Sequence, residues 1–272
     1  MRFVFTRLGK RELVTSLMVV IFIAFFILPF VVVTLKSFSV GWRFPELLPQ
    51  AYSLNGWQSI FRDPSLRESI VTTLMVGLYV VLLNLLLSLP AAKILSICSF
   101  KGKSIIEIAL LSPILIPGML LAMGLQFTMI RFGLADQILG VVLVHLIPTL
   151  PYAIRIMRAG YERLGTSLGE QASVLGAGPY LRFFTISLPL LLPSIRSLML
   201  LTFVISLGQY ALTAIIGGGN VMTLSLLYYP YFSSSNEAVI AGFSILFALL
   251  PLLFIGGVEI VLRLVIRAVN RV

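Results

Sequence analysis

Reactive and charged side chains are scarce in this 272-residue chain, which has one cysteine, one histidine and only 11% charged residues. A lone Cys98 excludes an internal disulfide and a thiolate metal cluster. A lone His145 excludes the HExxH motif and any multi-histidine metal site. The chain also has no GxxxxGK[ST] phosphate loop, so it does not bind ATP by that route. We therefore expect a non-catalytic chain without a cofactor or metal of its own.

Acidic pairs inside apolar stretches, the usual mark of a proton relay, are missing as well. The three acidic residues nearest to such stretches, Glu107, Glu162 and Glu259, all lie toward their ends. This placement disfavours an ion-coupled secondary transporter. A membrane-embedded enzyme or assembly factor is a second alternative, but no hydrolytic set of residues supports it.

The chain does contain long apolar runs, since 59% of its residues are hydrophobic and its mean hydropathy is +1.06. A span needs about 20 apolar residues, and its backbone must be helical to satisfy its own hydrogen bonds in lipid. The first run follows a basic N-terminus and lacks a small-residue cleavage site, so it reads as a retained span. The six predicted spans are Leu13–Leu35, Ile70–Ala92, Ile108–Ile130, Gln137–Ile154, Pro193–Ile215 and Ala238–Val258.

Lysine and arginine are distributed unequally between the two predicted sides. Fifteen of the 20 basic residues fall at the termini and in the loops on one side. The positive-inside rule makes that side cytoplasmic, and both termini with it. The net charge of +10 is explained by this pattern, so we do not expect nucleic-acid binding.

One polar segment, residues 166–189, stands between the fourth and fifth predicted spans on the cytoplasmic side. Ser167 and Glu170 have the spacing of a capping box, with Ser167 as N-cap. Gly176 is suited to end that short helix, and Gly178-Pro179 to start a second one. The apolar residues of the first helix would share one face: Leu168, Ala172 and Leu175. An amphipathic helix lying on lipid headgroups is the alternative interpretation.

The sequence Glu170–Pro189, EQASVLGAGPYLRFFTISLP, resembles the EAA signature of binding-protein-dependent ABC importer permeases. The chain departs from the family pattern at Gln171, where the family usually has alanine. The resemblance covers most of the chain from about residue 66 onward. The matching positions are Glu170, Ala172, Gly176, Ile186, Leu188 and Pro189.

The resemblance implies an all-α integral membrane fold, the type I ABC importer permease fold, as a single domain over residues 1–272. Six transmembrane helices would carry a cytoplasmic coupling helix between helices 4 and 5. In this family the coupling helix enters a cleft on a cytoplasmic ATPase, which binds ATP and Mg. The contact with the ATPase would be made by Glu170, Gln171, Ala172, Leu175, Gly176 and Ala177. For Glu170, the capping box and the contact with the partner compete for one carboxylate.

The resemblance also implies partners, a location and a class of substrate. The partners would be two ABC ATPase subunits, a second homologous permease or a second copy, an extracytoplasmic solute-binding protein and membrane lipid. The location would be the bacterial cytoplasmic (inner) membrane, crossed several times. The compact form is most similar to the polyamine, ferric-iron and thiamine subgroup, so the expected substrate is a small solute such as a polyamine. Ferric iron, thiamine or another small solute is the alternative.

Polar residues recur along the fifth predicted span at the spacing of one helix face: Thr202, Ser206, Gln209 and Thr213. Unpaired polar groups are costly in hydrocarbon, so this face should meet protein or a water-lined route. Packing between helices is one interpretation, and a lining of the translocation path is the other. His145 in the fourth span leaves the same two alternatives open.

Overall fold

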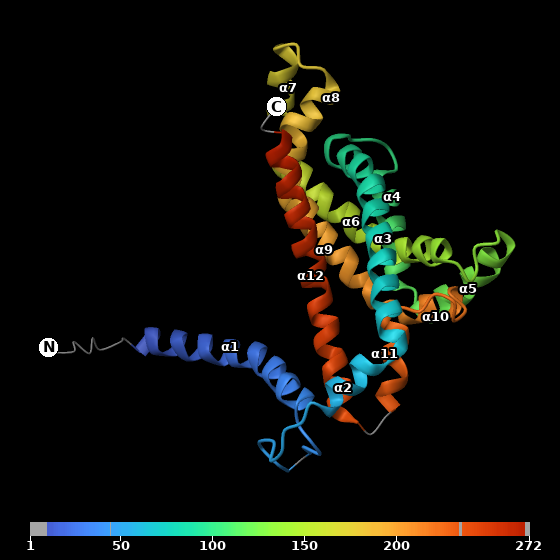
Figure 1. The fold of residues 1–272 in the computed structure, drawn as a ribbon. Coiled ribbons are helices and arrows are strands. Elements are labelled where there is room, and N and C mark those ends of the chain that lie inside the picture. Colours follow the sequence, from blue (N-terminus) through green and yellow to red (C-terminus); the bar gives the residue numbers. More distant parts are fainter. Residues whose placement is uncertain (1–9, 44, 234–235, 270–272) are drawn as a thin grey trace. The chain divides into compact units, whose positions relative to one another are not determined.

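The computed structural model describes residues 10–43, 45–233 and 236–269, and the regular secondary structure of these residues is helical, with no strand among them. Internal contacts divide the chain into two units. Unit 1 comprises Met1–Asp63 with Tyr231–Leu246, and unit 2 comprises Pro64–Pro230 with Phe247–Val272. Figure 1 shows the helices and their order along the chain.

Five described helices are long and apolar enough to cross a membrane, and a bent pair brings the number to as many as six. This agrees with the predicted all-α membrane fold. The helices in chain order are α1 (Lys10–Ser37), α2 (Asn55–Arg62), α3 (Pro64–Ile97), α4 (Lys103–Leu111), α5 (Gly118–Arg131), α6 (Ile138–Leu164), α7 (Ser167–Val174), α8 (Pro179–Arg182), α9 (Leu188–Leu207), α10 (Tyr210–Ile216), α11 (Leu224–Tyr228) and α12 (Glu237–Val269). Short turns η1 (Ser112–Leu115), η2 (Phe183–Ser187) and η3 (Tyr229–Ser233) complete the order.

The third predicted span is not one straight helix, which corrects the expectation for residues 108–130. The segment Lys103–Leu115 and the helix α5 meet at an angle of 102°. Pro117 lies at the break, and the preceding Ile116 is extended, with φ −86° and ψ 127°. A proline disfavours the helical conformation in the residue before it, so the apolar run bends at this point.

The fourth and fifth predicted spans also have different limits. α6 continues ten residues past the expected end at Ile154, to Leu164. The fifth apolar helix begins earlier, because α8, the π-helical turn η2 and α9 form one span over Pro179–Leu207. That span stops at Gly208 and Gln209, so residues 210–216 form the separate helix α10.

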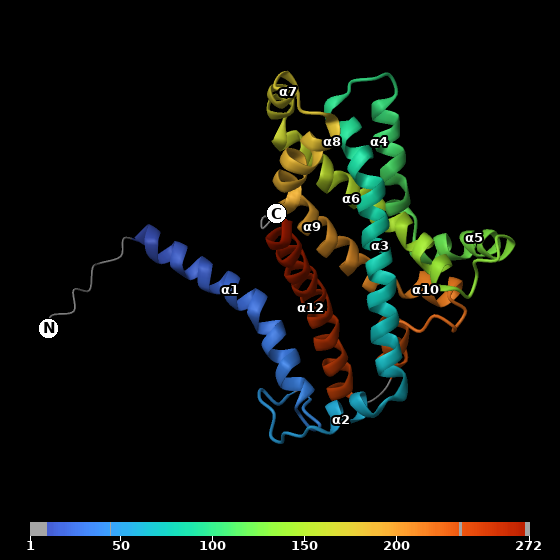
Figure 2. The ribbon, with the colours of Figure 1, turned by 45° about the horizontal axis from the view of Figure 1, so that its top comes forward.

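The core of unit 2 is formed where α3, α6 and α9 pack against one another, as Figures 1 and 2 show. Small residues permit the close approach. A side chain on Gly77 of α3 would meet the ring of Phe203 of α9 at 2.4 Å, and one on Gly160 of α6 would meet Ser194 at 2.5 Å. Such small residues are typical of helix contacts in membranes.

Unit 1 joins α1 and α2 to the first turns of α12. Ile60 of α2 is buried against Gly242, where an added Cβ would lie 2.5 Å from its side chain. Glu237 forms ion pairs with Lys36 and with Arg43. Tyr231 donates a hydrogen bond to Asp63 over 3.0 Å, and its burial, aided by that carboxylate, raises the pKa of Tyr231.

Candidate functional site: the α7–α8 bend and the polar core of unit 2

The predicted short helix of the polar segment is present as α7, which has eight residues. The predicted capping box is absent. Thr166, not Ser167, is the N-cap, and no side chain caps the helix. Because the helix starts one residue earlier than expected, Ser167 is its first residue and Glu170 its fourth, where the reciprocal capping contact is out of register. The carboxylate of Glu170 is exposed at the surface.

The end of α7 is a Schellman motif, in which two backbone hydrogen bonds close the last turn. The amide of Ala177 donates to the carbonyl of Ala172 over 2.9 Å, and the amide of Gly176 donates to that of Ser173 over 3.0 Å. Gly176 has φ +84°, a left-handed conformation that glycine adopts without a steric penalty. This confirms the expected role of Gly176 in ending the helix.

The chain then turns back into the long apolar helix. Gly178 is the N-cap of α8, and Pro179 occupies its first turn, as the sequence predicts. Arg182 ties the two helices together, because its Nη1 donates to the carbonyl of Gly169 in α7 over 3.1 Å. The bend between α7 and α8 is therefore fixed by local backbone bonds and by one arginine. Figure 2 shows it beyond the end of α9.

The tip of this bend presents apolar side chains to the surroundings. Val174 is 89% exposed, Leu175 is 87% exposed and Tyr180 is 82% exposed. Among the six residues predicted to contact an ATPase, Ala172 and Ala177 are half-buried, and the exposed ones are Glu170, Gln171, Leu175 and Gly176. The structure thus brings the six together on one protruding element.

Three of the four polar residues of the predicted translocation face lie inside the core of unit 2. Thr202, Ser206 and Thr213 are all buried. Ser206 and Thr213 contact His145 of α6, whose Nδ1 lies 2.9 Å from Ser206 Oγ and whose Nε2 lies 3.1 Å from Thr213 Oγ1. His145 therefore forms hydrogen bonds between helices, as the interpretation of helix packing requires.

Gln209, the fourth of these residues, differs from the others. It lies in the interruption between α9 and α10, with φ −81° and ψ 65°, and is only half-buried. Its carbonyl accepts a hydrogen bond from Thr213 Oγ1 over 2.7 Å. The predicted face thus spans a helix break, and Gln209 is its least buried member.

A further residue of the network, Thr149, was not singled out from the sequence. Its Oγ1 donates to the carbonyl of His145 over 2.7 Å and accepts from Asn84 Nδ2 of α3 over 2.9 Å. The position four residues after His145 on the same helix was the available signal. The network joins α3, α6, α9 and α10.

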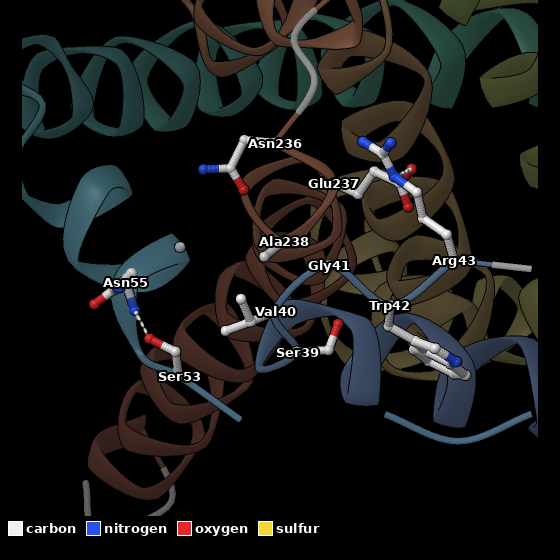
Figure 3. A pocket seen from close by; sticks show the side chains of 11 residues that line it. Ser39, Val40, Gly41, Trp42, Arg43, Ser53, Asn55, Asn236, Glu237 and Ala238 are labelled. Atoms are coloured by element: carbon white, nitrogen blue, oxygen red, sulfur yellow. Dashed lines mark hydrogen bonds and ion pairs between the residues drawn. The ribbon is translucent and has the colours of Figure 1, made fainter. Parts of the chain in front are cut away.

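Unit 1 contains a separate pocket of about 360 Å³. Figure 3 shows Glu237 and Arg43 side by side on it, 3.4 Å apart, and Asn55, whose backbone amide donates to Ser53 Oγ over 3.0 Å. Trp42 also lines the pocket. Its Nε1 donates to the carbonyl of Glu46 over 2.9 Å, which fixes the loop after α1.

Long apolar helices with a helical bend between two of them define an integral membrane protein of the all-α class. The family model described as "Binding-protein-dependent transport system inner membrane component" matches residues 84–271. The chain belongs to this family. It is accordingly the non-catalytic permease subunit of an ABC importer of the inner membrane. The resemblance predicted from the sequence is thus confirmed.

Several relatives have transport functions in their names. The chain is 25% identical over 242 residues to the putative 2-aminoethylphosphonate transport system permease protein PhnV of Salmonella typhimurium, covering 88% of this chain and 90% of the relative. It is 30% identical over 167 residues to the molybdenum transport system permease protein ModB of Escherichia coli K12, covering 57% and 72%. It is 32% identical over 135 residues to the molybdate/tungstate permease WtpB of Pyrococcus abyssi, where it spans only about half of each chain, 50% and 54%.

Solved structures share the fold. A bacterial ABC transporter involved in the import of alginate aligns with a TM-score of 0.69 and 18% identity, covering 95% of this chain and 98% of that one. The MetNI methionine ABC transporter in an inward-facing conformation aligns with a TM-score of 0.58 and 19% identity, covering 73% and 94%. At these identities the likeness concerns the fold alone.

Proposed function

We propose that α7 is the coupling helix of this permease and that it enters a cleft on a cytoplasmic ATPase. The observation that carries the proposal is the exposed, rigidly bent tip of α7, with Val174 and Leu175 almost fully accessible. An apolar tip of this kind is expected to be covered by protein in the assembly. Glu170, Gln171, Ala172, Leu175, Gly176 and Ala177 would form the contact, with Glu170 facing a basic group of the ATPase.

The assembly would contain two ATPase subunits, this permease with a homologous permease or a second copy, and a solute-binding protein. The ATPases would bind ATP and Mg, and the chain would act as one permease domain over its whole length. The unequal distribution of lysine and arginine supports placing both termini and α7 in the cytoplasm. Closure of the ATPases would draw the two coupling helices together and open the pair to the other side.

The test is a charge reversal, Glu170→Lys, in the purified complex reconstituted into vesicles. We expect the ATPase to dissociate or ATP hydrolysis to be uncoupled from uptake, because a lysine would repel the basic group. Glu68→Lys is the matched control, since Glu68 is exposed on the first turns of α3, far along the chain from α7. Full ATP-driven uptake by Glu170→Lys would refute the proposal.

We further propose that the cargo is a small solute, for which the sequence resemblance favours a polyamine. Molybdate, tungstate and 2-aminoethylphosphonate appear in the names of relatives, and these solutes are anionic or zwitterionic. Uptake should be measured with the solute-binding protein that copurifies. Inhibition of this uptake by spermidine would then indicate a polyamine as the cargo. Inhibition by molybdate, ferric iron, thiamine or 2-aminoethylphosphonate would indicate one of the other solute classes.

The translocation path is proposed to run beside the interruption between α9 and α10. Gln209 is the residue best placed to line it, because it is half-buried while Thr202, Ser206 and Thr213 are closed inside the unit. Discontinuous helices at membrane depth are tolerated where backbone is covered by protein or lines a water-filled cavity. The three buried residues would support the path by holding the interruption in place.

A further inference from the structure

The short helix α7 is joined to the rest of unit 2 through a glycine on each side. Gly165, between α6 and α7, has φ +66° and ψ −171°, a backbone conformation that is nearly exclusive to glycine. Gly176, between α7 and α8, has φ +84°. At both glycines an added Cβ would have nothing within 4 Å, so there is open space beside each joint. The direction of α7 therefore depends also on contacts made elsewhere.

A groove of about 250 Å³ lies between α7 and the ends of two long helices. Lys93 and Ile97 line it from α3, Tyr161 lines it from α6, and Gly169 lines it from α7. Its volume is several times the roughly 30 Å³ that one water occupies in the liquid, whereas protein interiors are close-packed. Packing against α3 and α6 therefore does not hold α7 on this side. The elements against which α7 does pack are α8 and the turn η2.

One side chain links α7 to its neighbours by a hydrogen bond, namely Arg182 of α8. Its Nη1 donates to the carbonyl of Gly169 over 3.1 Å, and its Nε is buried. Among the residues that the structure describes, no other side-chain hydrogen bond or ion pair joins α7 to another helix. A guanidinium holds its donors in a rigid plane, and a charged donor forms a stronger bond than a neutral one. Arg182 is therefore well suited to fix an angle between two helices.

The helix that carries Arg182 is firmly attached to the core of unit 2. α8, η2 and α9 together form one span over Pro179–Leu207, and α9 packs against α3 and α6. Leu191 and Leu198 of α9 are fully buried in this packing. The bond from Arg182 to Gly169 therefore ties α7 to a helix that is itself held on several sides.

We propose that Arg182 is a positioning residue for coupling, because its bond to Gly169 sets the direction in which α7 projects from the span over Pro179–Leu207. This inference rests on the proposed function of α7 as the coupling helix and names the residue that orients it. Without the bond, α7 turns at Gly165 and Gly176 toward the groove. Movement of the ATPase then rotates α7 instead of displacing the span. The free energy of one such bond shifts a local equilibrium by about tenfold or more.

The first experiment measures the orientation of α7 in the full chain, purified in detergent without an ATPase. Spin labels are placed at two exposed positions, Ser173 of α7 and Ser197 of α9, after Cys98→Ser has removed the native thiol. We expect a narrow distribution of distances between the labels. Arg182→Met should make it about twice as wide, because a segment with fewer contacts samples more orientations. Arg182→Lys keeps a charged donor but not the rigid fork, so its distribution should lie between the two.

The second experiment uses the complete complex in vesicles and measures the solute imported per ATP hydrolysed. Arg182→Met should lower this ratio by about tenfold while the ATPase stays bound, and Arg182→Lys should recover part of it. If the arginine only supported the fold, its loss would lower the midpoint of unfolding or the yield of complex and leave the ratio unchanged. Arg155→Met is the matched control and should keep the wild-type ratio, since Arg155 is exposed on α6 and lines a different cavity.

The proposal fails if either the distance distribution or the transport ratio of Arg182→Met equals that of the wild type. The distance measurement contains no ATPase, so its outcome is independent of whether α7 is the coupling helix. Unchanged distances together with loss of uptake in Glu170→Lys would refute the role of Arg182 alone. Uptake that survives Glu170→Lys would refute the coupling role of α7, even where the distances show that Arg182 orients the helix.

Discussion

The imidazole of His145 is held between two hydroxyl groups, with Nδ1 2.9 Å from Ser206 Oγ and Nε2 3.1 Å from Thr213 Oγ1. The hydroxyl of Thr213 already donates its proton to the carbonyl of Gln209. It therefore accepts from Nε2–H, and Nδ1 accepts from the hydroxyl of Ser206. One neutral tautomer satisfies both nitrogens and fastens α6 to both sides of the interruption between α9 and α10.

The first prediction concerns this tautomer. Because His145 is the only histidine in the chain, ¹⁵N-histidine labelling with a tag free of histidine gives a single imidazole spectrum. We expect a protonated Nε2 and an unprotonated Nδ1. Thr213→Val should shift the Nε2 resonance by removing its acceptor and should leave Nδ1 nearly unchanged. A protonated Nδ1 in the wild-type protein would contradict the network.

The second prediction concerns the contact between Gly77 and Phe203. Phe203 is fully buried and stacks on Phe254 with ring centroids 4.1 Å apart, so its ring has little room to move. A Cβ on Gly77 would lie 2.4 Å from that ring. Gly77→Ala should destabilise the protein by about 1–3 kcal/mol, the usual effect of overpacking. Reversible unfolding in mixed micelles measures the change.

Gly124→Ala is the control for that experiment. Gly124 is exposed in α5, and an added Cβ has nothing within 4 Å. Its substitution should be neutral or stabilising by up to about 1 kcal/mol, since alanine favours the helix. Equal stabilities of Gly77→Ala and Gly124→Ala would show that α3 and α9 do not pack closely at Gly77.

The third prediction separates two glycines of the α7–α8 bend. Both have open space where a Cβ would be, but Gly176 has φ +84° and Gly178 has φ −67°. Gly176→Ala should therefore cost about 1 kcal/mol from backbone strain alone. Gly178→Ala meets no such strain and should cost less, only what the poorer N-cap residue loses. Measured in the reconstituted complex, ATP-driven uptake should fall for Gly176→Ala and persist for Gly178→Ala. Equal losses of uptake in the two variants would show that transport does not depend on the left-handed conformation of Gly176.

The bend was predictable because its signals are local. Gly176 ends one helix and Gly178-Pro179 starts the next through backbone rules that need no tertiary contact. The prediction of a capping box was wrong for an equally local reason. Thr166 and Ser167 are both of residue types that are favoured at N-caps, and the residue that precedes the helix is Thr166. A one-residue shift was enough to remove the contact of Glu170.

The interruptions within the predicted spans were not predictable from hydropathy. Mean hydropathy over a window depends on how many residues are apolar and carries no information on the direction of the helix axis. The bend at Pro117 and the end of α9 at Gly208 therefore do not change it. The partners of His145 were equally hidden. The sequence placed Ser206 and Thr213 on one face, but only the packing of α6 against α9 and α10 shows that a histidine fills the space between them.

The last prediction tests the translocation path by comparing Gln209→Leu with Ser206→Ala. Gln209 is half-buried in the interruption and its side chain is not part of the His145 network, so its replacement should lower uptake without changing the stability of the chain. Ser206→Ala removes a donor to buried His145 and should destabilise the chain by about 1 kcal/mol, as interhelical hydrogen bonds in membranes do.

Uptake per assembled complex and the midpoint of unfolding should be measured for both variants, with basal ATP hydrolysis as the check on assembly. A path-lining Gln209 predicts lower uptake at unchanged stability and hydrolysis for Gln209→Leu. A supporting Ser206 predicts lower stability, with uptake falling only as the complex is lost. Unchanged uptake in Gln209→Leu would remove Gln209 from the path, because a leucine of similar length cannot replace an amide that contacts a passing solute.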